Sequence, residues 1–191
     1  MPPPRLYCTT CTLRVTSSSL SAALCTDFSS TQNKYDLTKS STYQKEGKIW
    51  STSYGDGASA SGVTGRDIVN LGGLAITNQR IGMAQQESAQ FAQGPLDHLL
   101  GLGFNTVADT KTPVDSLIVQ NLISKPVFGV FLGPTSTGGD VKYVFGGYDA
   151  SKVSGSFTTA KAGTVSLLTV LLMPALPPLA PSLLLLTLVP V

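Results

Sequence analysis

The sequence predicts an all-β protein with one or two short helices, and three observations support this fold class. Glycine is abundant, with 19 residues among 191, and serine and threonine are frequent. Aromatic and β-branched residues recur in short runs bounded by these turn-forming residues, as expected for strands. No long stretch before the C-terminal tail places apolar residues at helical spacing. The length suits one sizeable β-rich core better than two lobes with a cleft between them.

Charge and cysteine usage disfavour several classes of function. Charged residues make up 13% of the chain, and the net charge of +2 comes from scattered lysines and arginines, so we expect no nucleic-acid partner. Cys8 and Cys11 form a Cys-x-x-Cys, but no second pair follows and His98 is the only histidine. A zinc or redox site is therefore not favoured, and we expect no metal and no cofactor.

The two ends of the chain differ in composition from its middle. Residues 1–24 contain no acidic residue and no apolar run long enough for a signal peptide, so no secretory signal is evident. In residues 160–191 no charge follows Lys161, and leucine runs alternate with prolines. One interpretation is that both ends come from a misplaced splice site or a shifted reading frame. Four prolines remove backbone donors and break a helix, which disfavours a membrane span: Pro174, Pro177, Pro178 and Pro181.

Residues 25–159 are interpreted as the globular domain, and its first clear element is a β-hairpin. A strand beginning at Ile49 leads into Tyr54-Gly55-Asp56-Gly57, and a second strand follows at Val63–Val69. The Asp-Gly pair favours the positive backbone torsions of a two-residue hairpin turn. Taken alone, the same pattern also fits a surface turn whose tyrosine covers an edge of the core.

Further strands and one helix follow in order. Arg66–Leu74 and Ile76–Gln79 predict a strand, a glycine turn and another strand. Asp97–Phe104 ends in closely spaced glycines, which suits a short buried strand that another backbone approaches closely. Pro113–Ile123 combines an amphipathic pattern with a proline near its start, which predicts a short helix. The last predicted elements are paired strands that close the sheet, Phe128–Leu132 and Tyr143–Asp149.

Five short motifs follow one another in a fixed order along this domain. They are Tyr35-Asp36-Leu37-Thr38-Lys39-Ser40-Ser41-Thr42-Tyr43, Tyr54-Gly55-Asp56-Gly57, Leu99-Leu100-Gly101-Leu102-Gly103, Pro126-Val127-Phe128, and Phe145-Gly146-Gly147-Tyr148-Asp149 with Gly155-Ser156-Phe157. Each motif alone is weak, but five at compatible spacing are specific. In this order the chain resembles the pepsin-like aspartic peptidases, above all the acid peptidases of fungi. The likeness covers residues 25–159 and corresponds to a single, incomplete N-terminal lobe of a bilobal fold.

The resemblance implies an endopeptidase that cleaves peptide bonds in acid with a water held between two aspartates that share one proton. In that family the hairpin is a flap that folds over the bound peptide. By position, Tyr54 lines the pocket beside the scissile bond, and Gly55, Asp56 and Gly57 hydrogen-bond the substrate backbone. The implied partners are a peptide or protein substrate and a C-terminal lobe. The family is typically secreted or vacuolar.

The chain departs from the family at the catalytic aspartates. Each lobe of the family supplies its aspartate from an Asp-Thr-Gly or Asp-Ser-Gly turn, and none of the nine aspartates here begins that motif. The nearest upstream segment that resembles this motif is Val15-Thr16-Ser17-Ser18-Ser19-Leu20, which has valine in place of the aspartate. The second motif belongs to a C-terminal lobe that is absent. We therefore name no catalytic residue and expect this chain, folded alone, to hydrolyse nothing.

Smaller departures concern single residues. The family often pairs a cysteine like Cys25 with a nearby cysteine, and the matching position here is Thr31. His98 lies where the family usually has glycine, and we interpret it as a tolerated substitution. Asp97 is interpreted as a structural hydrogen-bonding group. Two aromatic residues are interpreted as packing residues rather than ligand contacts, Tyr43 and Trp50.

Three functional hypotheses remain open at this point. In the first, the gene encodes an acid endopeptidase and this chain is a damaged or truncated copy. In the second, the chain is a pseudo-peptidase or non-catalytic lobe that binds peptides with its flap and half of a cleft. In the third, the leucine-rich tail attaches the protein to a membrane, which the prolines disfavour.

Overall fold

The computed structural model describes residues 19–21, 35–92, 98–102, 110–132, 141–153 and 182–187. These residues belong to two compact units, one within Met1–Leu122 and the other within Ile123–Val191. Strands dominate both units, and the helices are short, which confirms the predicted all-β class. Several residues singled out above lie outside the described residues: Cys8, Cys11, Cys25, Thr31 and Asp97.

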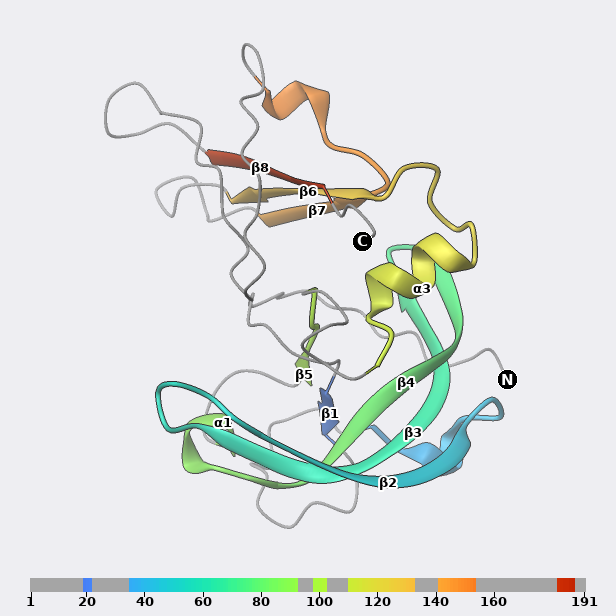
Figure 1. The fold of residues 1–191 in the computed structure, drawn as a ribbon, viewed down its shortest axis with the longest axis vertical. Helices are drawn as coiled ribbons and strands as arrows, with labels where there is room; N and C mark the ends of the chain where they lie inside the picture. Colours follow the sequence, from blue (N-terminus) through green and yellow to red (C-terminus); the bar gives the residue numbers. More distant parts are fainter. Residues whose placement is uncertain are drawn as a thin grey trace. The chain divides into compact units, whose positions relative to one another are not determined.

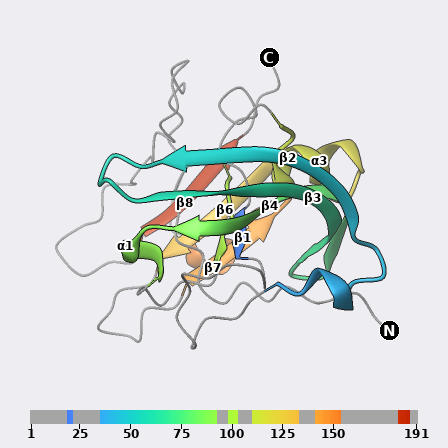
Figure 2. The same cartoon turned by 90° about the horizontal axis from the view of Figure 1, so that it is seen from below.

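The first unit contains a five-stranded sheet with the order β2-β3-β4-β1-β5. Strands β2 (Gln44–Ser53), β3 (Ser59–Leu71) and β4 (Leu74–Glu87) form an antiparallel meander. Strand β1 (Ser19–Ser21) pairs parallel with β4, and β5 (His98–Leu99) pairs antiparallel with β1. Figures 1 and 2 show the three meander strands running side by side and bending together. The first two strands of the meander form the hairpin that the sequence predicted, and both are longer than expected.

Glycines allow the turn between β3 and β4 and the close approach of these two strands. Gly72 and Gly73 join β3 to β4 with φ of 58° and 98°, values that glycine adopts without steric cost. Gly62 lies at a register shift between β3 and β4, where an added Cβ would come within 2.0 Å of the carbonyl oxygen of Met83. The close approach of the two backbones therefore requires glycine at this position.

The core of this unit lies between β3, β4 and the helix α3 (Pro113–Val119). Ile76 and Ile81 on β4, and Val114 and Leu117 on α3, are at most 1% exposed. Thr112 and Asp115 form a capping box at the start of the helix, with a proline in the first turn as predicted.

The helix ends earlier than the predicted limit at Ile123. Asn121 takes a φ of 54°, and the N–H groups of Asn121 and Leu122 donate to Ile118 and Leu117 at 3.0 and 2.9 Å. This is the hydrogen-bond pattern of a Schellman C-cap. Leu122 and Ile123, the last two apolar positions of the predicted helix, therefore lie beyond its end.

A buried carboxylate ties the residues that precede β2 to β3. Asp67 is 3% exposed and accepts hydrogen bonds from the hydroxyls of Tyr35 and Thr42 and, at 2.7 Å, from the N–H of Ile68. Burial alone would raise the pKa of Asp67, but the hydrogen bonds, including one from Ser40, outweigh burial and lower it. Burial and the neighbouring carboxylate raise the pKa of Tyr35. Asp67 therefore serves as a structural acceptor.

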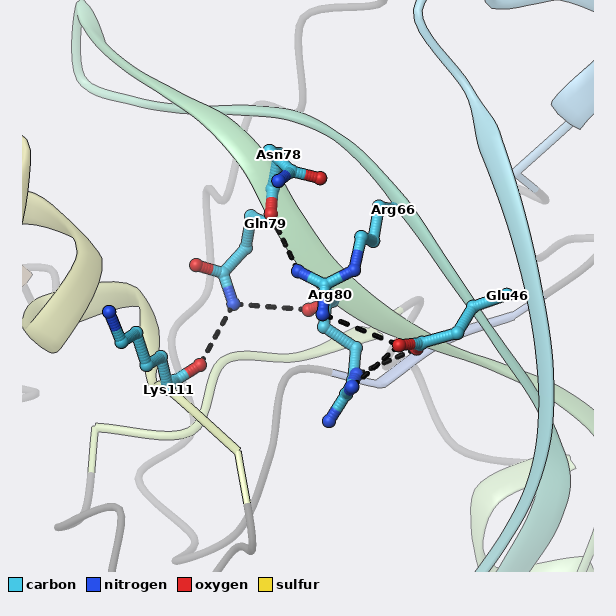
Figure 3. Close-up of polar contacts among 6 residues, drawn as sticks. All are labelled: Glu46, Arg66, Asn78, Gln79, Arg80 and Lys111. Carbon is cyan, nitrogen blue, oxygen red and sulfur yellow. Dashed lines mark hydrogen bonds and ion pairs between the residues drawn. The ribbon is translucent and has the colours of Figure 1, made fainter.

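A second polar cluster crosses the meander on β2, β3 and β4 (Figure 3). Arg66 and Arg80 are directly opposite each other on β3 and β4, and Glu46 of β2 lies between their guanidinium groups. Arg80 binds both carboxylate oxygens, at 2.7 and 2.5 Å, and Arg66 binds one at 3.3 Å. The Arg80 hydrogen bond lowers the pKa of Glu46 to about 2. One carboxylate thus separates two like charges that face each other across the strands.

The second unit contains a three-stranded sheet with the order β7-β6-β8. Strand β6 (Val127–Leu132) pairs antiparallel with β7 (Val141–Phe145) and with β8 (Ser182–Thr187). The predicted pairing of β6 with β7 is confirmed, but these strands do not close the first sheet; they form a sheet of their own. The third strand comes from the leucine-rich tail. Two side chains of β6 are completely buried, Phe128 and Val130.

A short 3-10 helix, Ala150–Lys152, follows β7. Asp149 caps it by accepting from the N–H of Ser151 at 3.0 Å and also binds Lys142 of β7 at 2.7 Å. The Lys142 bond lowers the pKa of Asp149 to about 2, together with those from Ser151. Lys152 lies 4.5 Å from the ring centroid of Phe131, in cation–π geometry. These contacts hold the residues after β7 against β6 and β7.

Candidate functional site

The candidate site is the tip of the hairpin between β2 and β3. The two strands stay paired up to Ser53 and Ser59, and the four predicted site residues form the turn between them. The Gly57 N–H donates to the Tyr54 carbonyl oxygen at 3.0 Å, and the Tyr54 N–H donates to the Ala58 carbonyl oxygen at 2.8 Å. The turn is therefore closed by two internal hydrogen bonds.

The turn differs in detail from the predicted two-residue type. Within Tyr54–Gly57 only Gly57 has a positive φ, at 84°, so Asp56 does not share the left-handed conformation. The Asp56 Oδ1 instead accepts from the N–H of Ala58 at 3.1 Å. A side chain that bonds the backbone two residues on stabilises a longer turn, which explains the difference. Ala58, at 2% exposure, ends the turn inside the protein.

The backbone at the tip is open on its outer side. Gly55, Asp56 and Gly57 are exposed, and an added Cβ at either glycine would meet no atom within 4 Å. Exposed peptide groups without side-chain cover can pair with the backbone of an extended peptide. The tip can therefore offer main-chain hydrogen bonds to a ligand.

Tyr54 is half-buried and contacts a residue that the sequence did not single out. Its ring meets the ring of Phe91 edge-on, with centroids 5.4 Å apart and planes at 74°. Phe91 belongs to the short helix α1 (Ala89–Ala92), which follows β4 and lies beside the hairpin tip in Figures 1 and 2. Edge-to-face aromatic pairs are favourable beyond the area they bury. Nothing local in the sequence pairs these two rings, because they come from separate elements.

Trp50 and Tyr43 pack against glycines of the meander. An added Cβ at Gly82 would lie 3.0 Å from the Trp50 ring, and one at Gly65 would lie 2.5 Å from the Tyr43 ring. The Trp50 Nε1 also donates to the Val63 carbonyl oxygen at 3.2 Å. Both aromatic residues therefore help to position the strands that carry the tip.

Aspartates within the described ranges mostly serve the local structure. Asp36 caps the 3-10 helix Leu37–Lys39, and hydrogen bonds from Thr38 lower its pKa. Asp115 caps α3 and Asp149 caps the turn after β7. In the part of the chain that the structure describes, no group of three or more His, Cys, Asp and Glu side chains could hold a metal ion. In the same part, no helix is long and apolar enough to cross a membrane.

The segment 15–20, which resembles the catalytic turn of the family, lies mostly outside the described residues. Its last two residues, Ser19 and Leu20, lie in β1, where Ser19 pairs with Gly82 of β4 and Leu99 of β5. The side chains of His98 and Asp97 are outside the described part. The site that the structure defines is thus the hairpin tip and its support on α1.

Comparison with known proteins connects this geometry to a family. The family model for eukaryotic aspartyl proteases matches residues 11–172, which is most of the chain. The chain belongs to the eukaryotic aspartyl protease family. The resemblance to pepsin-like peptidases stated from the motifs is thereby confirmed.

Fungal aspartyl proteases are among the similar relatives. The chain is 58% identical to rhizopuspepsin-4 of Rhizopus niveus over 141 residues, which are 72% of this chain and 35% of the relative. It is 58% identical to syncephapepsin of Syncephalastrum racemosum over 144 residues, 74% of this chain and 36% of the relative. Cathepsin E-B of Xenopus laevis is 41% identical over 129 residues, 64% and 32% of the two chains. The aligned part spans about a third of the length of these relatives.

Proposed function

We propose that this chain is the flap-bearing lobe of an aspartic endopeptidase and that Tyr54, Gly55, Asp56 and Gly57 bind the backbone of an extended peptide substrate. The observation that carries the proposal is the open glycine backbone of the tip beside a half-buried tyrosine. Membership of the aspartyl protease family supports the choice of a peptide as ligand. In this arrangement the exposed peptide groups supply hydrogen bonds, and the tyrosine ring supplies an apolar wall.

We further propose that these 191 residues bind peptide without cleaving it. None of the nine aspartates begins an Asp-Thr-Gly or Asp-Ser-Gly turn, so the chain lacks the carboxylates that would activate a water molecule. General acid–base catalysis by a positioned group contributes about 10²–10⁴-fold, and a chain that has neither carboxylate loses this contribution. This favours a non-catalytic peptide-binding lobe, or a pseudo-peptidase, as the second candidate function of the chain by itself.

Peptide binding is tested by NMR on the full chain. An extended, mainly apolar peptide of about eight residues is added at mildly acidic pH, and we expect the amide signals of Tyr54–Gly57 to shift most. The Tyr54→Ala variant should weaken binding by about ten-fold, while Lys48→Ala, on the same hairpin but away from the tip, should not. Shifts confined to other regions, with the tip unchanged, would contradict the proposed site.

Cleavage is tested separately. The full chain is incubated with a denatured protein between about pH 3 and pH 7, a range that includes the ordinary carboxylate pKa near 4, and the products are examined by mass spectrometry. We expect no peptide bond to be hydrolysed beyond the blank. Cleavage activity that co-purifies with the chain through two chromatographic steps would overturn the non-catalytic proposal. It would indicate an enzyme that uses a different catalytic group.

For the protein as a whole, we propose that residues 25–159 form the body of the lobe, that the flanking segments 1–24 and 160–191 add β1 and β8 to its sheets, and that the protein is secreted or vacuolar. The shift in composition at both boundaries supports the division. Sequencing the transcript across both boundaries tests it. An Asp-Thr/Ser-Gly motif read in frame upstream of Cys25 would favour an active endopeptidase, whereas a transcript that encodes these 191 residues would favour the binding lobe.

A further inference from the structure

The hairpin leaves the sheet at a defined residue. Strand β3 pairs with β4 up to Ala60 opposite Glu87, whereas β2 and β3 stay paired up to Ser53 opposite Ser59. Beyond Ala60 the hairpin therefore extends past its last paired position on β4. Ser59 is the first residue of this projecting part on the β3 side.

Ser88 holds the projecting part at its base. The Ser59 N–H donates to the Ser88 Oγ at 3.1 Å, and the Ser88 N–H donates to the Ser59 carbonyl oxygen at 2.9 Å. Ser88 follows β4 directly, and its own carbonyl oxygen accepts from the N–H groups of Phe91 and Ala92 at 2.9 and 3.1 Å. It thus occupies the N-terminal capping position of α1, where serine is favoured, while its hydroxyl binds the neighbouring strand.

The same short segment also contacts the tip. Phe91, three residues after Ser88, meets the Tyr54 ring edge-on at 5.4 Å. The segment 88–92 therefore touches the hairpin at two places, its base and its tip. Loss of the contact at the base should leave the hairpin freer to swing away from Phe91.

We propose that Ser88 is a positioning residue of the flap, which fixes the pivot at Ser59 and so keeps the tip against α1. This inference rests on the proposed function of the tip as the peptide-binding flap. The side-chain bond is the adjustable part of the pivot, because the backbone bond between the two residues remains whatever side chain follows β4. A chain without the Ser88 hydroxyl should populate a detached flap more often.

The size of the effect follows from the value of one exposed hydrogen bond. A net contribution of about 0.5–1 kcal/mol corresponds to a two- to five-fold change in an equilibrium, so we expect Ser88→Ala to raise the detached population by about that factor. NMR on the full chain without peptide measures this population from relaxation dispersion of the Tyr54–Ser59 amides. The nuclear Overhauser effect between the Tyr54 and Phe91 rings should weaken in parallel.

Two further variants separate the pivot from helix capping. Ser88→Thr keeps the hydroxyl and should restore the behaviour of the unmodified chain. Ser88→Gly removes the hydroxyl but is nearly as good a helix cap, so it should loosen the flap as Ser88→Ala does. A change in Ser88→Ala alone, without one in Ser88→Gly, would assign the effect to capping and overturn the proposal.

Two other outcomes also overturn it. In the first, relaxation dispersion and the contact between the two rings are unchanged in Ser88→Ala. In the second, exchange rises equally over all of β3 and β4, and this would indicate only a general loss of stability. Because no peptide is present, failure here leaves the peptide-binding test intact. If peptide fails to shift the tip while Ser88→Ala still loosens it, the binding function fails and the pivot stands.

Discussion

At the scale of single residues, Glu46 has the clearest energetic role. Its carboxylate lies between Arg66 and Arg80, which face each other directly on neighbouring strands. The folded-state pKa of about 2 lies below the ordinary value of 4.5, so the ionised form is favoured in the folded protein. This contribution to stability is present above about pH 4.5 and is lost as the pH falls toward 2.

We expect Glu46→Gln to lower the free energy of unfolding by about 1–2 kcal/mol at pH 7, a value reduced from the full pKa shift because the cluster is partly exposed to solvent. The difference between the variant and the unmodified chain should shrink between about pH 4.5 and pH 2. Urea unfolding across this pH range measures it. Lys48→Gln, an exposed change on the same strand, should stay within about 0.5 kcal/mol at every pH. Parallel pH profiles for Glu46→Gln and the unmodified chain would show that the ion pairs contribute nothing.

Little of this residue-scale detail could be predicted from the sequence. The packing roles of Tyr43 and Trp50 were expected because large aromatic residues are usually buried. The partners of Glu46 and Asp67 were not expected, since they come from other strands and depend on the register of the sheet. Phe91 was missed for the same reason, because only the fold brings it to Tyr54.

At the scale of elements, local sequence determines where the hairpin turn lies, and a side-chain hydrogen bond determines its length. The Asp-Gly pair correctly placed a tight turn at Tyr54–Gly57, and the Asp56 side chain then lengthened it by bonding the N–H of Ala58. The helix α3 behaves alike: Pro113 marked its start, but Asn121 in a left-handed conformation ended it early. The start of α3 follows from a short motif, whereas its end depends on the left-handed conformation that Asn121 adopts in a C-cap.

The two tip glycines provide a matched pair of variants. We expect Gly57→Ala to destabilise the protein by about 1 kcal/mol, because a φ of 84° brings a Cβ too close to the following carbonyl oxygen. Gly55→Ala should be nearly neutral, since Gly55 has no positive φ and an added Cβ meets no atom within 4 Å. Denaturant unfolding of both variants measures the difference. Equal costs at the two positions would contradict the observed turn.

At the scale of the whole molecule, the leucine-rich tail changes the interpretation most. Its composition disfavoured a membrane helix and suggested sequence outside the domain, but residues 182–187 form β8 and pair with β6. Each Leu-to-β6 pairing joins residues far apart in the chain, for example Val130 with Leu184. Strands from distant segments pair only when the fold brings them together, so composition alone could not reveal this role.

A disulfide can test that pairing. With Cys8, Cys11 and Cys25 replaced by serine, Val130→Cys combined with Leu184→Cys should form an intramolecular disulfide under mild oxidation, because directly opposed residues lie close enough for the bond. Val130→Cys with Leu183→Cys should not, since neighbouring residues of a strand point to opposite faces. Non-reducing gel electrophoresis and peptide mapping distinguish the products. Equal yields, or disulfides formed only between molecules, would show that the tail does not pair in this register.

The sequence by itself determined the all-β class, the hairpin with its turn at Tyr54–Gly57, the start of α3, the family resemblance and the lack of an Asp-Thr-Gly or Asp-Ser-Gly motif in these 191 residues. Each of these depends on residue type and on neighbours along the chain. Tertiary structure alone decided that Arg80 neutralises Glu46, that Tyr54 meets Phe91, and that Ser88 binds Ser59. These contacts require a sheet register and a helix position that many distant residues set together, and no short stretch of sequence contains that information.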